Sequence, residues 1–161
     1  MEKIPLKDIV LGQFEDNRFL RYDILVKYLF IEKYYEKNKP DYFHFRMYDK
    51  LYIAKGTSKK HIRWEYDLFT ILIDSFELSG FRGEYPISIT KDYHMCGGSH
   101  RIALSIWHDI ASVPVVFDEK CVNDRKRKHS RGWMKKHGFS KKMGVLDVAK
   151  KTVFAKLGIN K

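Results

Sequence analysis

The stretch Cys96-Gly97-Gly98-Ser99-His100-Arg101 places a hydroxyl, an imidazole and a guanidinium directly after two glycines. Residues 85–90 before it alternate apolar and polar side chains and predict a strand. Residues 101–109 carry apolar side chains at helical spacing and predict a helix. Glycines let the backbone approach a ligand closely, and a helix N-terminus favours an anion. The stretch is therefore a candidate phosphate-binding turn; the alternative is a tight strand-to-helix turn with solvated polar side chains.

The segments around this turn resemble the core of the ParB/sulfiredoxin-like superfamily. The shared pieces are a helix that ends at Gly80, then Pro86-Ile87, Gly98-Ser99-His100-Arg101, a helix to Asp109, and Val113-Pro114-Val115-Val116-Phe117. The resemblance covers residues 64–117 well and residues 4–18 in part. It implies an α/β fold, a small mixed sheet with flanking helices. The nucleotide-binding domain would span residues 1–119, with a helical and aromatic insertion at about 19–63, and residues 120–161 would form a basic helical extension.

Net charge is concentrated in the tail. Residues 120–161 hold 14 Lys or Arg against two Asp, a net charge of +12, whereas residues 1–119 carry a net charge of −1. Such a field attracts nucleic acid or an anionic membrane surface, although a charge run can also be only a solvated face. The candidate polyanion-binding residues are Arg125, Lys126, Arg127, Lys128, Arg131, Lys135 and Lys136.

Composition limits the class of protein. The length of 161 residues suits one domain, and 44% hydrophobic residues exclude a disordered chain. No apolar run is long enough to predict a membrane span, and no secretory signal is expected. Cys96 and Cys121 are too few and too poorly spaced for a zinc site or a disulfide framework. We therefore expect a cytoplasmic protein, with attachment to the inner membrane face through the basic tail as an option.

The resemblance also implies a chemistry. Sulfiredoxins carry a nucleophilic cysteine where this chain has Ser99, and a serine lacks the soft thiolate that sulfinic-acid reduction needs. What the resemblance retains is nucleotide phosphate binding by Gly97, Gly98, Ser99, His100 and Arg101. Arg18, in a segment similar to the start of ParB-type domains, is a further nucleotide-binding candidate. No general base is evident in contact with Ser99, so a covalent role for it is not expected.

A second branch of the superfamily contains small kinases that phosphorylate a hydroxyl of a free amino acid. Their proposed catalytic base corresponds to Glu65, which could alternatively only complement a helix dipole. The resemblance implies a nucleotide-dependent kinase that uses ATP or ADP with Mg²⁺, with Glu65 and His100 as catalytic residues. The acceptor would be a small hydroxyl-bearing metabolite or sugar, with an anionic one attracted by the tail. The acidic residue that these kinases carry ahead of the turn is replaced by Gly97, which leaves Asp67 and Asp92 as substitute metal ligands.

The third branch supplies the alternative function, a ParB-like protein that binds nucleotide and DNA without small-molecule chemistry. Two predicted helices in the tail, over residues 133–139 and from about residue 140 to 157, keep this alternative open. Trp133 and Phe139 are expected to anchor the tail on the core. The last helix shows an apolar stripe formed by Val145, Val148, Ala149, Thr152, Val153 and Leu157.

Other segments complete the expected order of elements. Residues 4–10 predict a first strand, and residues 23–35 predict a helix with a broad apolar face. Residues 42–53 are aromatic and partly alternating, which favours a strand or a hairpin. Residues 55–60 predict a turn.

Overall fold

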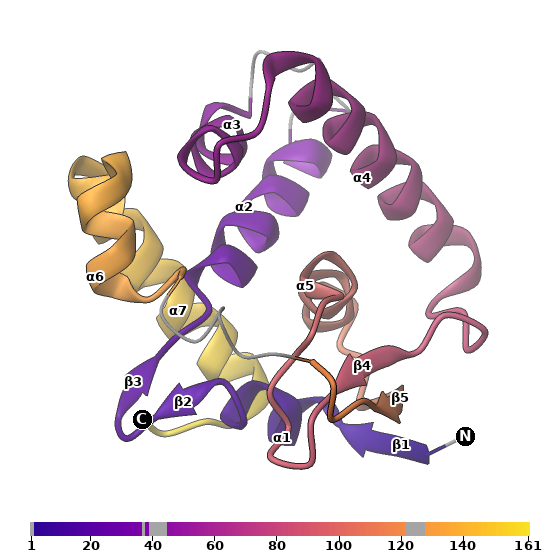
Figure 1. Cartoon of the computed structure of the whole chain (residues 1–161). Coiled ribbons are helices and arrows are strands. Elements are labelled where there is room, and N and C mark those ends of the chain that lie inside the picture. Colours follow the sequence, from indigo (N-terminus) through magenta and orange to yellow (C-terminus); the bar gives the residue numbers. More distant parts are fainter. Residues whose placement is uncertain (1, 37, 39–44, 122–127) are drawn as a thin grey trace.

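The computed structural model describes residues 2–36, 38, 45–121 and 128–161. Its central element is α2 (Tyr22–Glu36), which confirms the helix predicted over residues 23–35. Ten of its fifteen residues are buried, among them Ile24, Leu25 and Ile31. A helix that is apolar around most of its circumference belongs in a core, and α2 is covered by other helices on several sides (Figure 1).

A three-stranded sheet lies below these helices in Figure 1. Its order is β1 (Glu2–Pro5), β5 (Ser112–Phe117), β4 (Ile87–Ile89), with β1 antiparallel and β4 parallel to β5. The strands predicted at residues 85–90 and 113–117 are confirmed. The coarse α/β class is therefore correct: the chain is a mixed α/β protein with a small sheet and several helices.

The first predicted strand, residues 4–10, is wrong beyond Pro5. The chain turns into the short helix α1 (Leu6–Leu11) because Leu6, Ile9 and Val10 have helical spacing and are all buried. A small hairpin follows, in which β2 (Phe14–Glu15) pairs with β3 (Arg18–Phe19).

The strand or hairpin predicted over residues 42–53 is also wrong where it can be compared. Residues 42–44 lie outside the described part, and the rest forms α3 (Arg46–Ala54). Tyr48, Leu51 and Tyr52 are buried on one face, and this i, i+3, i+4 spacing outweighs the partial alternation seen in the sequence.

The longest described helix is α4 (Lys59–Ser79), whose first two residues fall within the turn predicted at residues 55–60. The Ser58 hydroxyl accepts the His61 N–H at 3.3 Å and caps its first turn. Ile62, Phe69 and Ile73 point into the core, whereas Trp64, Ile71 and Leu78 are exposed. The helix ends at Gly80, as the resemblance implied.

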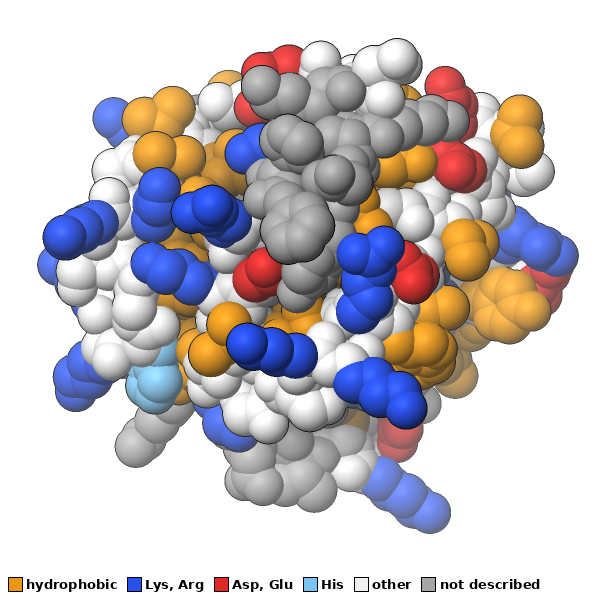
Figure 2. All heavy atoms as spheres, turned by 90° about the horizontal axis from the view of Figure 1, so that it is seen from above, with side chains coloured by type: hydrophobic (Ala, Val, Ile, Leu, Met, Phe, Trp, Pro, Cys, Tyr) orange, Lys and Arg blue, Asp and Glu red, His pale blue; other side chains and the backbone are white. Residues whose placement is uncertain are grey.

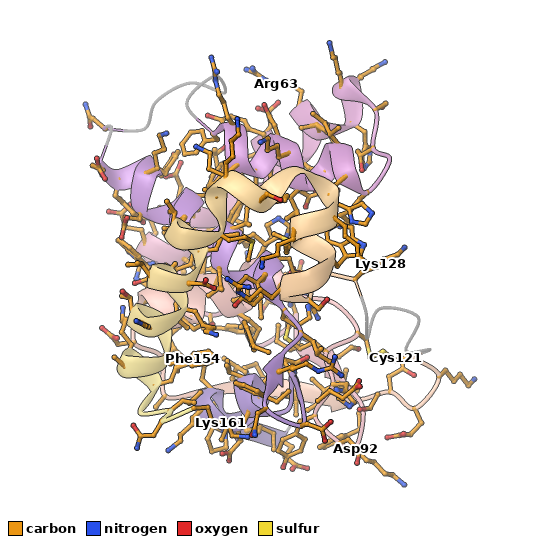
Figure 3. The ribbon with its side chains drawn as sticks, turned by 90° about the vertical axis from the view of Figure 1, so that its left-hand side faces the viewer. Arg63, Asp92, Cys121, Lys128, Phe154 and Lys161 are labelled. Atoms are coloured by element: carbon orange, nitrogen blue, oxygen red, sulfur yellow. A yellow bond between two sulfur atoms is a disulfide. The ribbon has the colours of Figure 1, made fainter. Side chains whose placement is uncertain are left out.

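The basic tail folds onto the same core as the rest of the chain. It contains α6 (Arg131–Met134), the π-helical turn η2 (Lys135–Phe139), the 3₁₀ turn η3 (Ser140–Lys142) and α7 (Met143–Leu157). Met134 and Phe139 are fully buried, so Phe139 anchors the tail as expected. Phe154 of α7 packs edge-on against Phe19 with ring centres 5.2 Å apart, and Figure 3 shows it inside the molecule.

The apolar stripe predicted for the last helix is only partly correct. Ala149 and Val153 are buried together with Leu146 and Phe154, but Val145 and Val148 remain 49% and 64% exposed. The buried face of α7 is therefore rotated away from these two valines.

The two cysteines contradict the sequence analysis, because Cys96 and Cys121 form a disulfide (Figure 3). Pairing two cysteines needs proximity in the fold, which their separation of 25 residues does not reveal. The bond connects the residue before the glycine turn to the segment after β5. Within the described ranges, no helix combines the length and hydropathy that crossing a membrane requires.

Candidate functional site

The glycine turn leads directly into the helix α5 (Ser99–Trp107), which begins two residues earlier than predicted. Gly98 has φ 85° and ψ 18°, a left-handed conformation that favours glycine, and its carbonyl accepts the first helical hydrogen bond from Ile102 at 2.9 Å. The N–H groups of the first turn of any helix lack partners within that helix. The N-terminus of α5, at the centre of Figure 1, therefore has the donor geometry expected of an anion site.

His100 lies among aromatic side chains that come from two other helices. Its Nε2 atom is 2.9 Å from the Tyr48 hydroxyl and 3.3 Å from the Tyr52 hydroxyl, both on α3. Its ring centre is 4.5 Å from that of Phe69 on α4. Burial lowers the pKa of His100 well below its ordinary value, and the charge of Lys27 lowers it further. His100 is therefore neutral at pH 7. We predicted that it would help to bind phosphate, but a neutral imidazole does not supply positive charge for this.

Ser99 has a basic partner that the sequence analysis did not find. The ammonium of Lys27 on α2 donates to the Ser99 hydroxyl, and both side chains are buried. Burial lowers the pKa of Lys27 to about 7, although the nearby Asp23 carboxylate acts in the opposite direction. A general base is thus in contact with Ser99, contrary to the expectation that none would be.

Asp23 organises the charges beneath this contact. Its carboxylate accepts two hydrogen bonds from Arg21, at 2.9 and 2.8 Å, and lies 3.7 Å from both Lys27 Nζ and His129 Nδ1. Burial alone would raise the pKa of Asp23, but Arg21, His129 and Lys27 outweigh it and hold that pKa well below the usual range. This buried cluster fixes α2 beneath the turn and against the tail.

The structure brings Glu65 to the same place as His100. Tyr48 is the link, because its hydroxyl contacts His100 and also donates to the Glu65 carbonyl at 3.5 Å. Burial raises the pKa of Tyr52, and a hydrogen bond with the Glu65 carboxylate raises it further. The carboxylate also lies 3.3 Å from His61 on the exposed side of α4. The two predicted catalytic residues, Glu65 and His100, therefore belong to one cluster of polar side chains.

Arg101 does not project freely from the turn. Its guanidinium donates to the carbonyls of Tyr85 and Pro86, and so fixes the entry to β4 against α5. Burial lowers its pKa. It also lines a cavity of about 200 Å³ together with Arg82, Tyr85 and apolar side chains of α4. Arg101 therefore positions the turn, and this cavity touches the turn at its side.

Three other candidates lie elsewhere. Arg18 is 71% exposed in the hairpin and pairs with Glu15 at 3.1 Å, so it is not part of the turn. Asp67 faces solvent and pairs with Arg63 at 3.6 Å. Figure 3 shows Arg63 and Asp92 at opposite ends of the molecule. Asp67 and Asp92 therefore cannot share a magnesium ion, and the described residues form no group of three or more metal-ligating side chains.

The basic tail residues are only partly available to a polyanion. Arg125, Lys126 and Arg127 lie outside the described residues. Arg131 forms a bidentate pair with Asp147, with its closer contact at 2.8 Å. Lys128, Lys135 and Lys136 are exposed, and Figure 2 shows Lys and Arg side chains gathered on the side where Figure 1 places α6.

The polar cluster predicts a pH-dependent stability. Burial lowers the pKa of His129 to about 4, against an ordinary value near 6.5. Between these values the unfolded chain binds a proton that the folded chain does not, so His129 contributes stability above pH 6.5 that is lost as the pH falls toward 4. We expect His129→Gln to flatten the rise in unfolding free energy from pH 4 to 6.5, measured by urea denaturation. An unchanged profile in His129→Gln would contradict the burial of a neutral imidazole.

Comparisons with known proteins add no family assignment. The chain matches no protein-family model, no curated protein and no solved structure. The class that fold and site define is accordingly a mixed α/β protein with a buried polar cluster beneath a glycine-rich helix N-terminus.

Proposed function

We propose that the chain binds a nucleoside di- or triphosphate at the N-terminus of α5 and transfers a phosphoryl group to a hydroxyl of a small metabolite. The observation that carries this proposal is the meeting of Glu65 and His100. They are 35 positions apart in sequence, yet both contact the hydroxyls of Tyr48 and Tyr52. Glu65 contacts Tyr48 through its backbone carbonyl and Tyr52 through its carboxylate, and a carboxylate that reaches a hydroxyl next to a bound phosphate would act as its base.

The roles follow from the chemistry of each group. The N–H groups of residues 97–101 would hold phosphate oxygens, and Gly97 leaves open space above them. Lys27 would contribute positive charge through Ser99, because its ammonium donates to the Ser99 hydroxyl. Glu65 would act as the base, and neutral His100 would orient the two tyrosines. The cavity of about 200 Å³ at Arg101 offers apolar walls for the rest of the ligand.

Magnesium fits this site less well than phosphate does. The described residues near α5 supply backbone donors and bases, whereas Asp67 and Asp92 lie away from each other. We therefore assign no step to a metal held by the protein.

Nucleotide binding is tested first, by adding a negative charge at position 97. A Cβ there would meet no atom within 4 Å, so a side chain can be added without a clash. We expect ATP or ADP to raise the melting temperature of the wild type and of Gly97→Asn. Gly97→Asp should weaken the affinity at least tenfold, because its carboxylate repels phosphate at short range. No stabilisation by ATP, ADP, CTP or GTP in the wild type would overturn the proposal.

The base is tested separately in Glu65→Gln. With serine, homoserine, glycerol and sugar phosphates as acceptors, we expect turnover to fall about 10²–10⁴-fold while nucleotide affinity stays within twofold. The control is Asp67→Asn, which removes an exposed carboxylate from the same helix and should leave both quantities unchanged. Equal turnover in Glu65→Gln and the wild type would exclude Glu65 as the base.

The DNA-binding alternative receives no support from a described contact, because Arg131 is paired with Asp147 and α7 packs into the core. The same nucleotide panel addresses it: stabilisation by CTP alone, with duplex affinity that falls steeply as salt is added, would favour that alternative.

A further inference from the structure

A large cavity lies away from the glycine turn. It has a volume of about 720 Å³ and is bounded by α2, by α3 with the preceding Phe45, and by Lys142 at the end of η3. Volumes of this size accommodate a small organic ligand. Three elements from distant parts of the sequence converge on it, which makes it a feature of the tertiary fold.

The inner wall of this cavity is aromatic and rigid. Phe30 and Phe45 are stacked with ring centres 4.0 Å apart, and Tyr48 lies 4.7 Å from Phe30. All three rings are buried. They form an apolar surface whose shape does not depend on a ligand being present, so a hydrophobic group can bind there without ordering the wall first.

The rim of the cavity is cationic. Four basic side chains line it and no described carboxylate does; they are Lys33, Arg46, Lys50 and Lys142. None of these four side chains pairs with a described carboxylate. Other cations of the chain do form such pairs within 4 Å; they are Arg18, Arg63, Arg82, Arg131 and Lys156. The Lys50 ammonium donates to the Gly138 carbonyl at 2.9 Å and holds α3 against the tail. Positive charges that are gathered around one opening, with no counterion among the described residues, favour a bound anion.

A second apolar cavity of about 350 Å³ shares Leu29 with the first. It lies between α2 and α7, and its walls include Val145 and Val148, the two valines of the predicted stripe that the fold leaves exposed. Glu32 also lines it, so its own rim is not cationic. Together the two cavities offer a cationic opening with an aromatic wall and an apolar extension beyond Leu29.

We infer that these two neighbouring cavities bind a soluble anionic amphiphile, a molecule with a carboxylate or phosphate head and an alkyl or aryl body. The head binds among the four cations, and the body packs on Phe30 and Phe45 toward Leu29 and the exposed valines. Hydrophobic affinity grows with each methylene that is buried, so a chain of eight to ten carbons is a sufficient probe. This site is distinct from the proposed nucleotide site, although Tyr48 contributes its ring to one and its hydroxyl to the other.

The test is calorimetric titration of the full chain with decanoate and decyl phosphate below their micellar concentrations. We expect both anions to bind and decyltrimethylammonium not to bind. Lys33→Gln/Lys142→Gln should weaken anion binding about tenfold or more. The matched control Lys3→Gln/Lys151→Gln removes the same charge from exposed positions outside the cavity and should change affinity less than twofold.

Methyl NMR locates the bound ligand independently of the charge variants. Met47 lines the cavity and Met95 does not, so decanoate should shift the Met47 methyl resonance and leave that of Met95 in place. Binding of the cationic amphiphile with equal affinity, equal weakening in both double variants, or an unshifted Met47 would overturn the inference. Binding to anionic phospholipid vesicles without binding of soluble decanoate would overturn it as well, because it would indicate a surface interaction.

Discussion

Replacing Asp23 with asparagine is expected to lower the free energy of unfolding by about 3–5 kcal/mol at pH 7. The carboxylate is 2% exposed and accepts two hydrogen bonds from Arg21, with Lys27 and His129 each 3.7 Å away. Asparagine keeps the shape but removes the negative charge, so the buried guanidinium of Arg21 loses its counterion. Urea denaturation monitored by tryptophan fluorescence measures the loss.

The partly exposed pair between Arg131 and Asp147 provides a control, because it is also bidentate; Asp147 accepts a further hydrogen bond from the Tyr22 hydroxyl at 3.0 Å. Asp147→Asn should cost about 1 kcal/mol or less, since solvent screens exposed pairs. The pH dependence gives a second check. Because the pKa of Asp23 is held well below the ordinary value, the wild type loses this advantage as the pH falls below about 3.9, and the two proteins should converge. A loss below 1 kcal/mol in Asp23→Asn would show that the cluster is not buried as described.

Replacing Gly98 with alanine is expected to lower the free energy of unfolding by about 2–3 kcal/mol. A left-handed conformation costs a residue with a Cβ about 1–2 kcal/mol, and Gly98 has φ 85°. The added Cβ would also lie 2.6 Å from Cδ1 of Ile87, so this fully buried side chain would have to shift within the core.

Gly97→Ala is the neighbouring control. Its Cβ would meet nothing within 4 Å and its φ lies outside the left-handed region, so we expect a change within 0.5 kcal/mol. If both alanine variants were equally stable, the left-handed turn between β4 and α5 would be wrong, and the anion-site geometry would fail with it.

Local sequence patterns were sufficient to predict much of the fold. The helix over residues 23–35 and the strand at 113–117 were predictable because their spacing or continuous apolar character agrees with how they are buried. The glycine turn was predictable for the same reason, since only a strand end followed by a helix start fits residues 85–109. Residues 46–53 fit both the two-residue spacing of a strand and the three-to-four-residue spacing of a helix. The sequence favoured a strand there, but Tyr48 and Tyr52 are buried together on one face of a helix.

The candidate site depended far more on the tertiary structure. Asp23 and Lys27 stand four positions apart on an otherwise apolar helix, a signal that could have marked a buried ion pair. Their contact with Ser99 and His129 could not be derived, because it joins residues separated by 72 and 106 positions. The same limit applied to the disulfide and to the hydrogen bonds from Arg101 to the carbonyls of Tyr85 and Pro86 before β4.

The sequence alone determined the α/β class, the position of most helices, the strand-turn-helix at Gly98 and the concentration of positive charge in the tail. These properties depend on residue types and on spacing within one element. Only the tertiary structure decided that Cys96 and Cys121 are paired, that His100 is neutral and in contact with two tyrosines, and that four cations surround one cavity. These properties depend on which distant side chains exclude water from one another, and burial sets both the strength of a charge and the pKa of a base.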